Sequence, residues 1–199
     1  HGAHGYLISQ FLGKKTNHRN DIWGGDIHKR SKFLIKIINE IKKSVPESFI
    51  VGVRISPEIN DMGIFLDDSL ELAKILTKIG IDFIHLSCWD CFKISDEYSK
   101  DKKTITEWFT HTISNLPTII STGGIWSSKD ATDVMMQGAD LIGVGRVAIP
   151  YPDWSLNLKD DNYNPPRMPF TSTQLTKAGL SDVFIAYMRN WKGFVEDEK

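Results

Sequence analysis

The chain has 199 residues, of which 41% are hydrophobic and 25% charged, and its 24 Lys and Arg against 25 Asp and Glu give a formal net charge of −1. This composition excludes disordered, collagen-like and coiled-coil proteins, and the balanced charge argues against nucleic acid as the main partner. No apolar run approaches the ~20 residues that span a membrane, no signal-peptide pattern is present, and the 2 cysteines are too few for a disulfide framework, so we expect a cytoplasmic protein without a membrane partner.

From Asp26 onward the sequence alternates between helix and strand patterns. Apolar residues recur every three to four positions from Asp26 to Val45, which is typical of an amphipathic helix, and Pro46 ends it. The nearly continuous apolar run over residues 49–56 predicts a strand buried on both faces of a parallel sheet. The remaining predicted elements are a helix at 66–79 with a capping box of Asp68 and Glu71, a strand at 81–87, a helix opened by Thr104 and Glu107, a strand at 118–122, a helix from 127 or 128 to Gly138, and a strand at 140–144.

This alternation predicts the fold class. Four βα units imply parallel strands joined by crossover helices, which fits either an open doubly wound sheet or an α/β (β/α)₈ TIM barrel. A complete barrel needs about 250 residues and eight strands, so we expect this chain to supply roughly the second half, strands 5–8. The chain opens at His1 without an initiator Met, which we interpret as the C-terminal part of a longer polypeptide. Residues 1–155 are the expected half-barrel, and residues 156–199 are an expected extension with a loop at 160–169 and a terminal helix within 175–195.

Glycines follow two successive predicted strands, in Thr122-Gly123-Gly124-Ile125 and in Gly143-Val144-Gly145-Arg146. In barrels the loops after the last two strands often bind a phosphate through backbone N–H groups, and an arginine adds a charge-assisted hydrogen bond. Each loop alone is equally compatible with a tight turn, but two in succession favour a phosphate site.

Arg54 lies at the C-terminal end of a predicted buried strand, where barrel enzymes have their active sites. A buried charge needs a partner, so Arg54 either binds a ligand or forms a structural salt bridge.

The opening His1-Gly2-Ala3-His4-Gly5-Tyr6 carries two imidazoles and a phenol. The histidines are candidate metal ligands, but no nearby spacing offers further ligands, so we predict no metal site. They are also candidate donors to a carbonyl oxygen or oxyanion, and Tyr6 is a candidate proton donor to a carbanion-like centre. A surface turn is the alternative. The pair Cys88 and Cys91 has the CxxC spacing of redox or zinc sites, but without a second pair an ordinary loop is the favoured interpretation.

Several of these motifs resemble one known family. They are, in chain order, the opening His1-Gly-Ala-His4-Gly-Tyr6-Leu-Ile-Ser-Gln-Phe-Leu, the segments at 17–25 and 30–33, Gly-Val-Arg54-Ile-Ser, Ser-Thr-Gly123-Gly124 and Gly-Val-Gly145-Arg146. In this order they resemble the Old Yellow Enzyme family of FMN-dependent NAD(P)H:flavin oxidoreductases. The opening segment in that family reads roughly H-x-A-[HN]-G-Y-L-x-x-Q-F-L. The resemblance covers about residues 1–155.

The resemblance implies a (β/α)₈ barrel that holds FMN at its C-terminal face, with NADH or NADPH as the reductant and an activated alkene or another small molecule as the electron acceptor. It implies that His1 and His4 bind the activating oxygen of the substrate and that Tyr6 donates the proton. It places Arg54 near the flavin pyrimidine edge and the residues of the two glycine loops, Gly123, Gly124, Gly145 and Arg146, at the FMN phosphate.

Two alternatives remain at this point. A phosphate-binding barrel isomerase or synthase without flavin would explain the glycine loops but not the histidines and Tyr6. A catalytically incompetent fragment of the oxidoreductase, acting as a folding or interaction module, would fit a half-barrel. A half-barrel also exposes strand edges, which makes a homo-oligomer an expectation.

Overall fold

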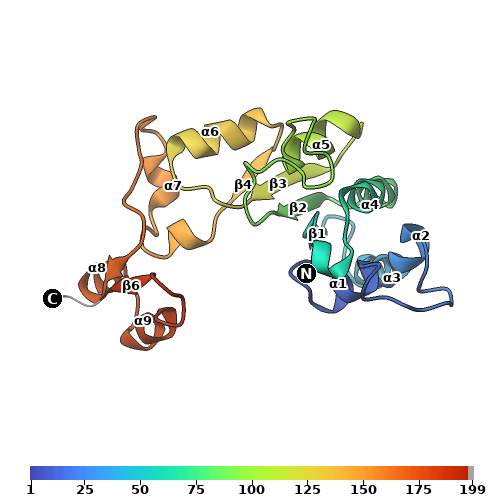
Figure 1. Ribbon diagram of the computed structural model, residues 1–199, viewed down its shortest axis with the longest axis horizontal. Helices are drawn as coiled ribbons and strands as arrows, with labels where there is room; N and C mark the ends of the chain where they lie inside the picture. The colour runs from blue at the N-terminus through green and yellow to red at the C-terminus, as the bar shows by residue number, and fades with distance from the viewer. Residues whose placement is uncertain (197–199) are drawn as a thin grey trace. The chain divides into compact units, whose positions relative to one another are not determined.

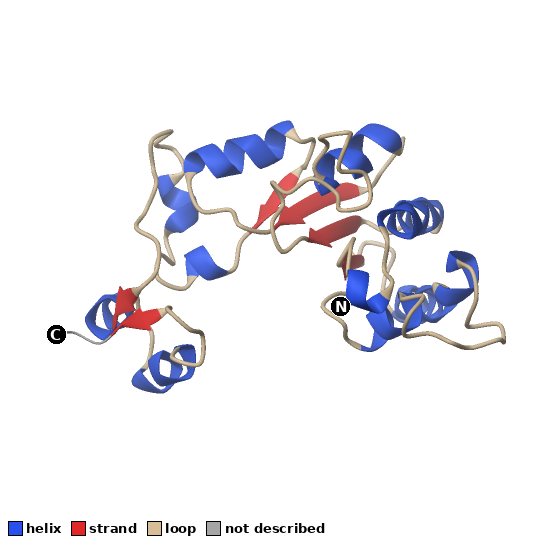
Figure 2. Ribbon diagram, in the orientation of Figure 1, coloured by secondary structure: helices blue, strands red, loops and turns tan. Residues whose placement is uncertain are grey.

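The computed structural model describes residues 1–196, and Figures 1 and 2 show its helices and strands. In chain order the elements are α1 (Leu7–Leu12), α2 (Ile27–Arg30), α3 (Lys32–Ser44), β1 (Gly52–Ile55), the 3₁₀ helix η1 (Asn60–Met62), α4 (Leu66–Lys78), β2 (Phe83–Ser87), α5 (Ile105–Thr112), β3 (Thr118–Thr122), α6 (Ser128–Met136), β4 (Leu141–Gly143), the 3₁₀ helix η2 (Arg146–Ala148), α7 (Trp154–Asn157), β5 (Phe170–Thr171), α8 (Ser172–Lys177), α9 (Asp182–Met188) and β6 (Val195–Glu196). Two compact units divide them: a larger unit of His1–Gly124 with Val134–Gly143, and a smaller unit of Ile125–Asp133 with the chain from Val144 onward.

The larger unit contains the predicted parallel sheet. Its strands lie in the order β1-β2-β3-β4, and each neighbouring pair is parallel. The register places Arg54 opposite His85 and Ser87 opposite Thr122. The prediction of four successive parallel strands is therefore confirmed (Figure 2).

The two faces of this sheet differ in polarity. One face packs against the helices, because alternate strand residues are buried in a single core with apolar residues of α3, α4 and α5. The strand members of this core are Val53, Ile55, Ile84, Leu86 and Ile119. The residues between them, such as Arg54 and His85, are only partly buried and lie on the opposite face. This open face is where the predicted site residue Arg54 is found.

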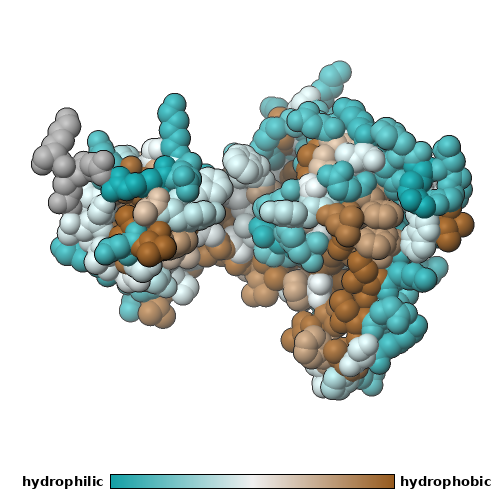
Figure 3. Space-filling view, turned by 90° about the horizontal axis from the view of Figure 1, so that it is seen from below, coloured by the Kyte–Doolittle hydropathy of each residue, from teal (hydrophilic) through white to brown (hydrophobic). Residues whose placement is uncertain are grey.

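The first strand is shorter than the apolar pattern predicts. The pattern extends from 49 to 56, but β1 begins at Gly52, and Phe49 and Ile50 are 55% and 69% exposed. Only the residues from Gly52 have a hydrogen-bonded partner in β2, so the apolar run continues beyond the paired part of the strand. Figure 3 shows a band of apolar side chains on one face of the larger unit.

Helix ends differ in two places from the predictions. The helical run that begins after Asp26 is divided at Ser31 into α2 and α3. The predicted capping box of Asp68 and Glu71 is wrong, because α4 begins at Leu66, whose N–H donates to the Glu97 carboxylate at 2.8 Å. The capping box of Thr104 and Glu107 at the start of α5 is confirmed, with both of its hydrogen bonds present.

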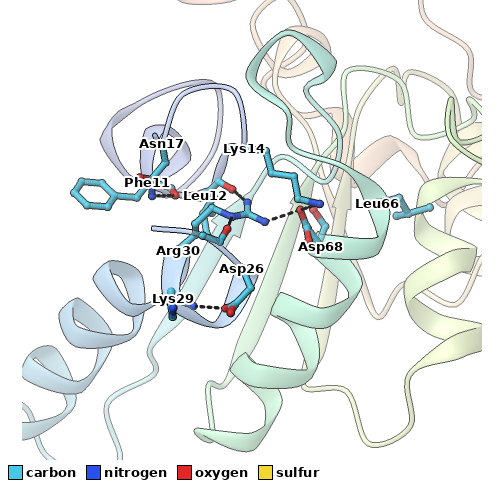
Figure 4. Close-up of polar contacts among 12 residues, drawn as sticks. Phe11, Leu12, Lys14, Asn17, Asp26, Lys29, Arg30, Leu66 and Asp68 are labelled. Carbon is cyan, nitrogen blue, oxygen red and sulfur yellow. Dashed lines mark hydrogen bonds and ion pairs between the residues drawn. The ribbon is translucent and has the colours of Figure 1, made fainter. Parts of the chain in front are cut away.

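A buried arginine holds the opening segment against α4 (Figure 4). The Arg30 side chain is 1% exposed and pairs with the Asp68 carboxylate at 2.8 Å. It also donates to the carbonyl oxygens of Leu12 and Gly25, the latter at 2.8 Å. Lys14 is a second, more exposed partner of Asp68 at 3.1 Å. Arg30 therefore connects the end of α1 to the first turn of α4, and so supports the segment that carries the two histidines.

In the smaller unit, two short helices replace the single helix predicted within 175–195. α8 ends before Gly179, whose φ of +92° is a conformation that glycine adopts readily. The Ser181 side chain then caps a separate helix, α9. The buried residues of this unit include both aromatic and aliphatic side chains. The indole N–H groups of Trp126 and Trp154 donate to the carbonyl oxygens of Pro165 and Trp126 at 2.7 and 2.6 Å. Across residues 1–196 no helix is long and apolar enough to cross a membrane.

Candidate functional site

Polar side chains gather on the open face of the sheet, where β1 and β2 end. Arg54 of β1 donates from Nη2 to the Ser87 hydroxyl oxygen at 2.8 Å. The guanidinium Nε is buried and has no hydrogen-bond partner among the described residues. A buried donor without a partner is unfavourable, because it has lost its bond to water. This N–H therefore fits an acceptor atom of a ligand on the open face.

The opening segment runs beside β1 and reaches the same end of the sheet. The Gly2 N–H donates to the Arg54 carbonyl oxygen at 2.7 Å, and Gly2 forms an isolated parallel bridge with Ile55. The chain then turns at His4 and Gly5, which have φ values of +60° and +78°. The His4 N–H donates to the Ser56 hydroxyl oxygen at 3.1 Å, which fixes this turn against the residue that follows β1.

The turn brings together the three residues that the sequence predicts as the substrate site. The His1 ring lies 5.7 Å from the His4 ring and 5.3 Å from the Tyr6 ring, centroid to centroid. His1, His4 and Tyr6 are all exposed, with 64% of Tyr6 accessible. Two imidazoles and a phenol are thus accessible together at the C-terminal end of β1.

The two histidines next to Arg54 are held in the neutral form. Burial and the Arg54 charge lower the pKa of His4, whose Nε2 lies 2.6 Å from the Ser87 hydroxyl oxygen. The pKa of His85 is lowered to about 4, by burial first and then by the charges of Arg54 and His4. The His85 Nε2 lies 2.6 Å from the Thr122 hydroxyl oxygen. The positive charge of Arg54 therefore lies next to two neutral imidazoles, which are hydrogen-bonded to hydroxyl groups.

Sequence reasoning did not identify His85, Ser87 or Thr122 as site residues. His85 and Ser87 belong to no recognisable motif, and each stands alone within an apolar strand pattern, whereas Thr122 opens the first glycine loop but was not singled out there. The pattern that could have identified His85 and Ser87 is the alternation of side chains along a strand. Phe83, His85 and Ser87 alternate with buried Ile84 and Leu86, so they lie on the same face of the sheet.

The first glycine loop is held by the segment that follows β2. The N–H groups of Cys88 and Cys91 donate to the carbonyl oxygens of Thr122 and Gly123 at 2.9 and 3.1 Å, and the Cys91 thiol donates to the latter at 2.8 Å. Gly123 has a φ of +146°, and a Cβ there would overlap the Cys88 carbonyl oxygen. Glycine is required at 123 for this close packing, and Gly124, with a φ of +74°, is exposed.

The two cysteines are both thiols, since neither forms a disulfide within the described chain. Burial is the main cause that raises the pKa of Cys88 well above its ordinary range, so the thiol stays protonated. Within the described part of the chain, no three His, Cys, Asp or Glu side chains form a group that could hold a metal ion.

In the second glycine loop, Gly145 and Arg146 belong to the smaller unit. Gly145 precedes η2, which begins at Arg146, and both residues are exposed. No atom lies within 4 Å of the position that a Cβ at Gly145 would occupy. The backbone of this loop is thus accessible to a ligand.

Comparison with known proteins gives a consistent result. Residues 1–164 match the model of the NADH:flavin oxidoreductase / NADH oxidase family. The chain is 30% identical over 200 residues to the probable NADH-dependent flavin oxidoreductase YqiG of Bacillus subtilis, covering 98% of this chain and 54% of that protein. It is 32% identical over 170 residues to the NADH:acrylate oxidoreductase of Vibrio harveyi, covering 81% of this chain and 17% of that protein.

A solved structure is similar in fold. Morphinone reductase in complex with tetrahydroNAD superposes with a TM-score of 0.64 at 23% identity, covering 88% of this chain and 45% of the other. The chain spans about half the length of YqiG and less than half of morphinone reductase. The four parallel βα units are therefore part of a (β/α)₈ TIM barrel, as the sequence predicts.

Proposed function

Because the chain belongs to the NADH:flavin oxidoreductase / NADH oxidase family, we propose that it carries the substrate-binding face of an FMN-dependent enzyme that uses NADH or NADPH to reduce an activated alkene. The observation that carries this proposal is the cluster of His1, His4 and Tyr6 beside Arg54 at the end of the parallel strands. One relative is named NADH:acrylate oxidoreductase, and acrylate is an alkene activated by a carboxyl group, which supports this acceptor class.

The residues of the open face fit a flavin. Arg54 presents a buried guanidinium N–H without a partner among the described residues, which suits an acceptor atom of the flavin pyrimidine edge. A positive charge there favours the reduced, anionic ring. Bound FMN supplies the hydride chemistry that no amino-acid side chain provides.

The two glycine loops are proposed separately as phosphate-binding segments. Gly124 is exposed next to Gly123, so its backbone is accessible. In the smaller unit, Gly145 exposes its backbone, and Arg146 offers a cationic side chain that suits a phosphate oxygen.

The opening segment then binds and protonates the substrate. His1 and His4 donate hydrogen bonds to its carbonyl or nitro oxygen, which stabilises the negative charge that develops on that oxygen. Tyr6 donates its hydroxyl proton to the α-carbon, the atom next to the activating group. The exposure of Tyr6 leaves its hydroxyl accessible to a substrate.

Stopped-flow measurement of the two half-reactions in the flavin-loaded protein tests this function with Tyr6→Phe. Reduction of the flavin by NADH should proceed nearly normally, while oxidation by 2-cyclohexenone should slow by a factor on the order of 10² to 10⁴, because the proton donor is lost. Tyr98→Phe is the matched control, since the Tyr98 hydroxyl donates to Asp67 at 2.6 Å, outside this cluster.

Equal slowing of both half-reactions in Tyr6→Phe would show that Tyr6 supports the flavin site instead of protonating the substrate. A protein with no visible flavin absorption after incubation with FMN would contradict the proposed function of this chain and favour either a flavin-free barrel or a catalytically incompetent fragment.

A further inference from the structure

Ser87 lies between Arg54 and His4 at the end of β2. Its side chain is buried, with 6% of the residue exposed. Its hydroxyl oxygen is 2.8 Å from Nη2 of Arg54 and 2.6 Å from Nε2 of His4. Among the described residues the hydroxyl has no other hydrogen-bond partner. One buried hydroxyl therefore connects the Arg54 guanidinium to the His4 imidazole.

The direction of each hydrogen bond follows from the donors that these groups carry. A guanidinium has only N–H donors, so the Ser87 oxygen must accept from Arg54. If Nε2 of His4 also donated to this oxygen, the buried hydroxyl proton would have no acceptor, which is unfavourable. If the hydroxyl donates to Nε2 instead, the Ser87 hydroxyl is fully satisfied, because it accepts from Arg54 and donates to His4. A neutral imidazole that accepts at Nε2 carries its proton on Nδ1.

We infer that Ser87 is a positioning residue that holds His4 in the Nδ1–H tautomer, so that Nδ1 is the atom that donates a hydrogen bond to the substrate oxygen. The identity of that substrate rests on the proposed function, whereas the tautomer does not. The lowered pKa of His4 supports the neutral ring that this arrangement requires. His4 is exposed, although its Nε2 is engaged by Ser87, so the ring remains open to a ligand.

The tautomer can be measured without flavin or substrate. In the ¹⁵N-labelled protein at pH 8, long-range ¹H–¹⁵N spectra of the imidazoles distinguish protonated from bare ring nitrogens. We expect Nδ1 of His4 to be protonated and Nε2 to be bare. Protonation of Nε2 in the unmodified protein would by itself overturn the inference, whatever the variants do.

Two variants separate positioning from a merely structural effect. Ser87→Ala removes the hydroxyl and should allow the Nε2–H tautomer to become populated, whereas Ser87→Thr retains a hydroxyl and should restore the original spectrum. Ser121→Ala is the matched control, because Ser121 is a buried serine of the neighbouring strand β3 that bonds Thr106 at 2.8 Å on the helix-facing side. It should leave the His4 signals unchanged. An unchanged His4 spectrum in folded Ser87→Ala would refute the inference.

Ligand binding provides the functional readout. In the flavin-loaded protein, Ser87→Ala should raise the Kd of 2-cyclohexenone about 3- to 10-fold, the effect of one weakened hydrogen bond, and Ser87→Thr should reverse most of it. Failure of FMN to bind any of these proteins would contradict the proposed function but leave the tautomer measurement valid. A tautomer shift in Ser87→Ala with an unchanged Kd would refute Nδ1 as the substrate donor.

Discussion

Removal of the negative charge at Asp68 should destabilise the protein strongly. Asp68→Asn keeps the shape of the side chain but leaves the Arg30 guanidinium, which is 1% exposed, without its counter-charge at 2.8 Å. Loss of one partner from a buried pair typically costs about 3–5 kcal/mol. The amide oxygen still accepts a hydrogen bond, and the Leu12 and Gly25 carbonyls still bind Arg30, so we expect about 3 kcal/mol. At roughly 2–4 °C per kcal/mol, Tm should fall by about 6–12 °C.

Thermal unfolding followed by circular dichroism measures this effect, and Lys14→Met is the control. Lys14 contacts the same carboxylate at 3.1 Å, but its side chain is 52% exposed. An exposed pair contributes about 0–1 kcal/mol and is screened by salt, so Lys14→Met should lower Tm by less than about 4 °C, and by still less in about 0.5 M NaCl. Equal shifts in Tm for the two variants would refute the argument that burial makes Arg30 the principal partner of Asp68.

Three further predictions concern the site. Gly123→Ala should lower Tm and abolish FMN binding, because the new Cβ overlaps the Cys88 carbonyl oxygen at a φ that disfavours alanine; a variant with the original Tm and FMN affinity would contradict this. Arg146→Ala should weaken FMN binding by about 1.5–3 kcal/mol, or about 10- to 150-fold in Kd by fluorescence titration, and an unchanged Kd would remove Arg146 from the phosphate site. Folding lowers the pKa of His85 from 6.5 to about 4, so the unfolded chain binds a proton on this side chain more tightly than the folded protein does. Above about pH 6.5 His85 is neutral in both states, so its titration has no effect on the free energy of unfolding. As the pH falls from 6.5 toward 4, protonation of the unfolded chain lowers the free energy of unfolding. Urea midpoints at pH 7.5 and 5 should therefore differ less in His85→Gln than in the unmodified protein, and an equal difference would show that His85 does not contribute.

The sequence predicts the half-barrel well because its strands and helices obey simple periodicities. Residues 118–122 form a strand as expected, and Thr104 begins a helix as expected. Asp68 has capping-box spacing from Glu71, but its carboxylate pairs with Arg30, a residue 38 positions earlier. Pairing over such a separation leaves no local pattern. The bounds of β1 also depend on contacts with a distant segment, because they are set by the residues that pair with β2, so hydrophobicity alone did not predict them.

The candidate site was predictable where residues that are close in the chain also lie close in space. His1, His4 and Tyr6 lie within one turn, and the structure brings their rings together. Ser87 was not predictable, because its importance depends on contacts with His4 and Arg54, 83 and 33 residues away. A single serine in an apolar strand carries no information about such contacts.

The left-handed backbone at His4 restricts which amino acids can evolve at this position. A φ of +60° is unfavourable for most side chains, and asparagine, aspartate and histidine adopt it most readily apart from glycine. Of these, histidine and asparagine carry an N–H that can donate to a neutral or anionic oxygen at neutral pH, whereas the side chains of glycine and aspartate do not. The pattern H-x-A-[HN]-G-Y, which the opening segment resembles, permits those same two residues. Backbone geometry thus admits four amino acids at this position, and the requirement for a hydrogen-bond donor reduces them to histidine and asparagine. If the proposed substrate contact is correct, other residues at this position should be found only in proteins that no longer use it.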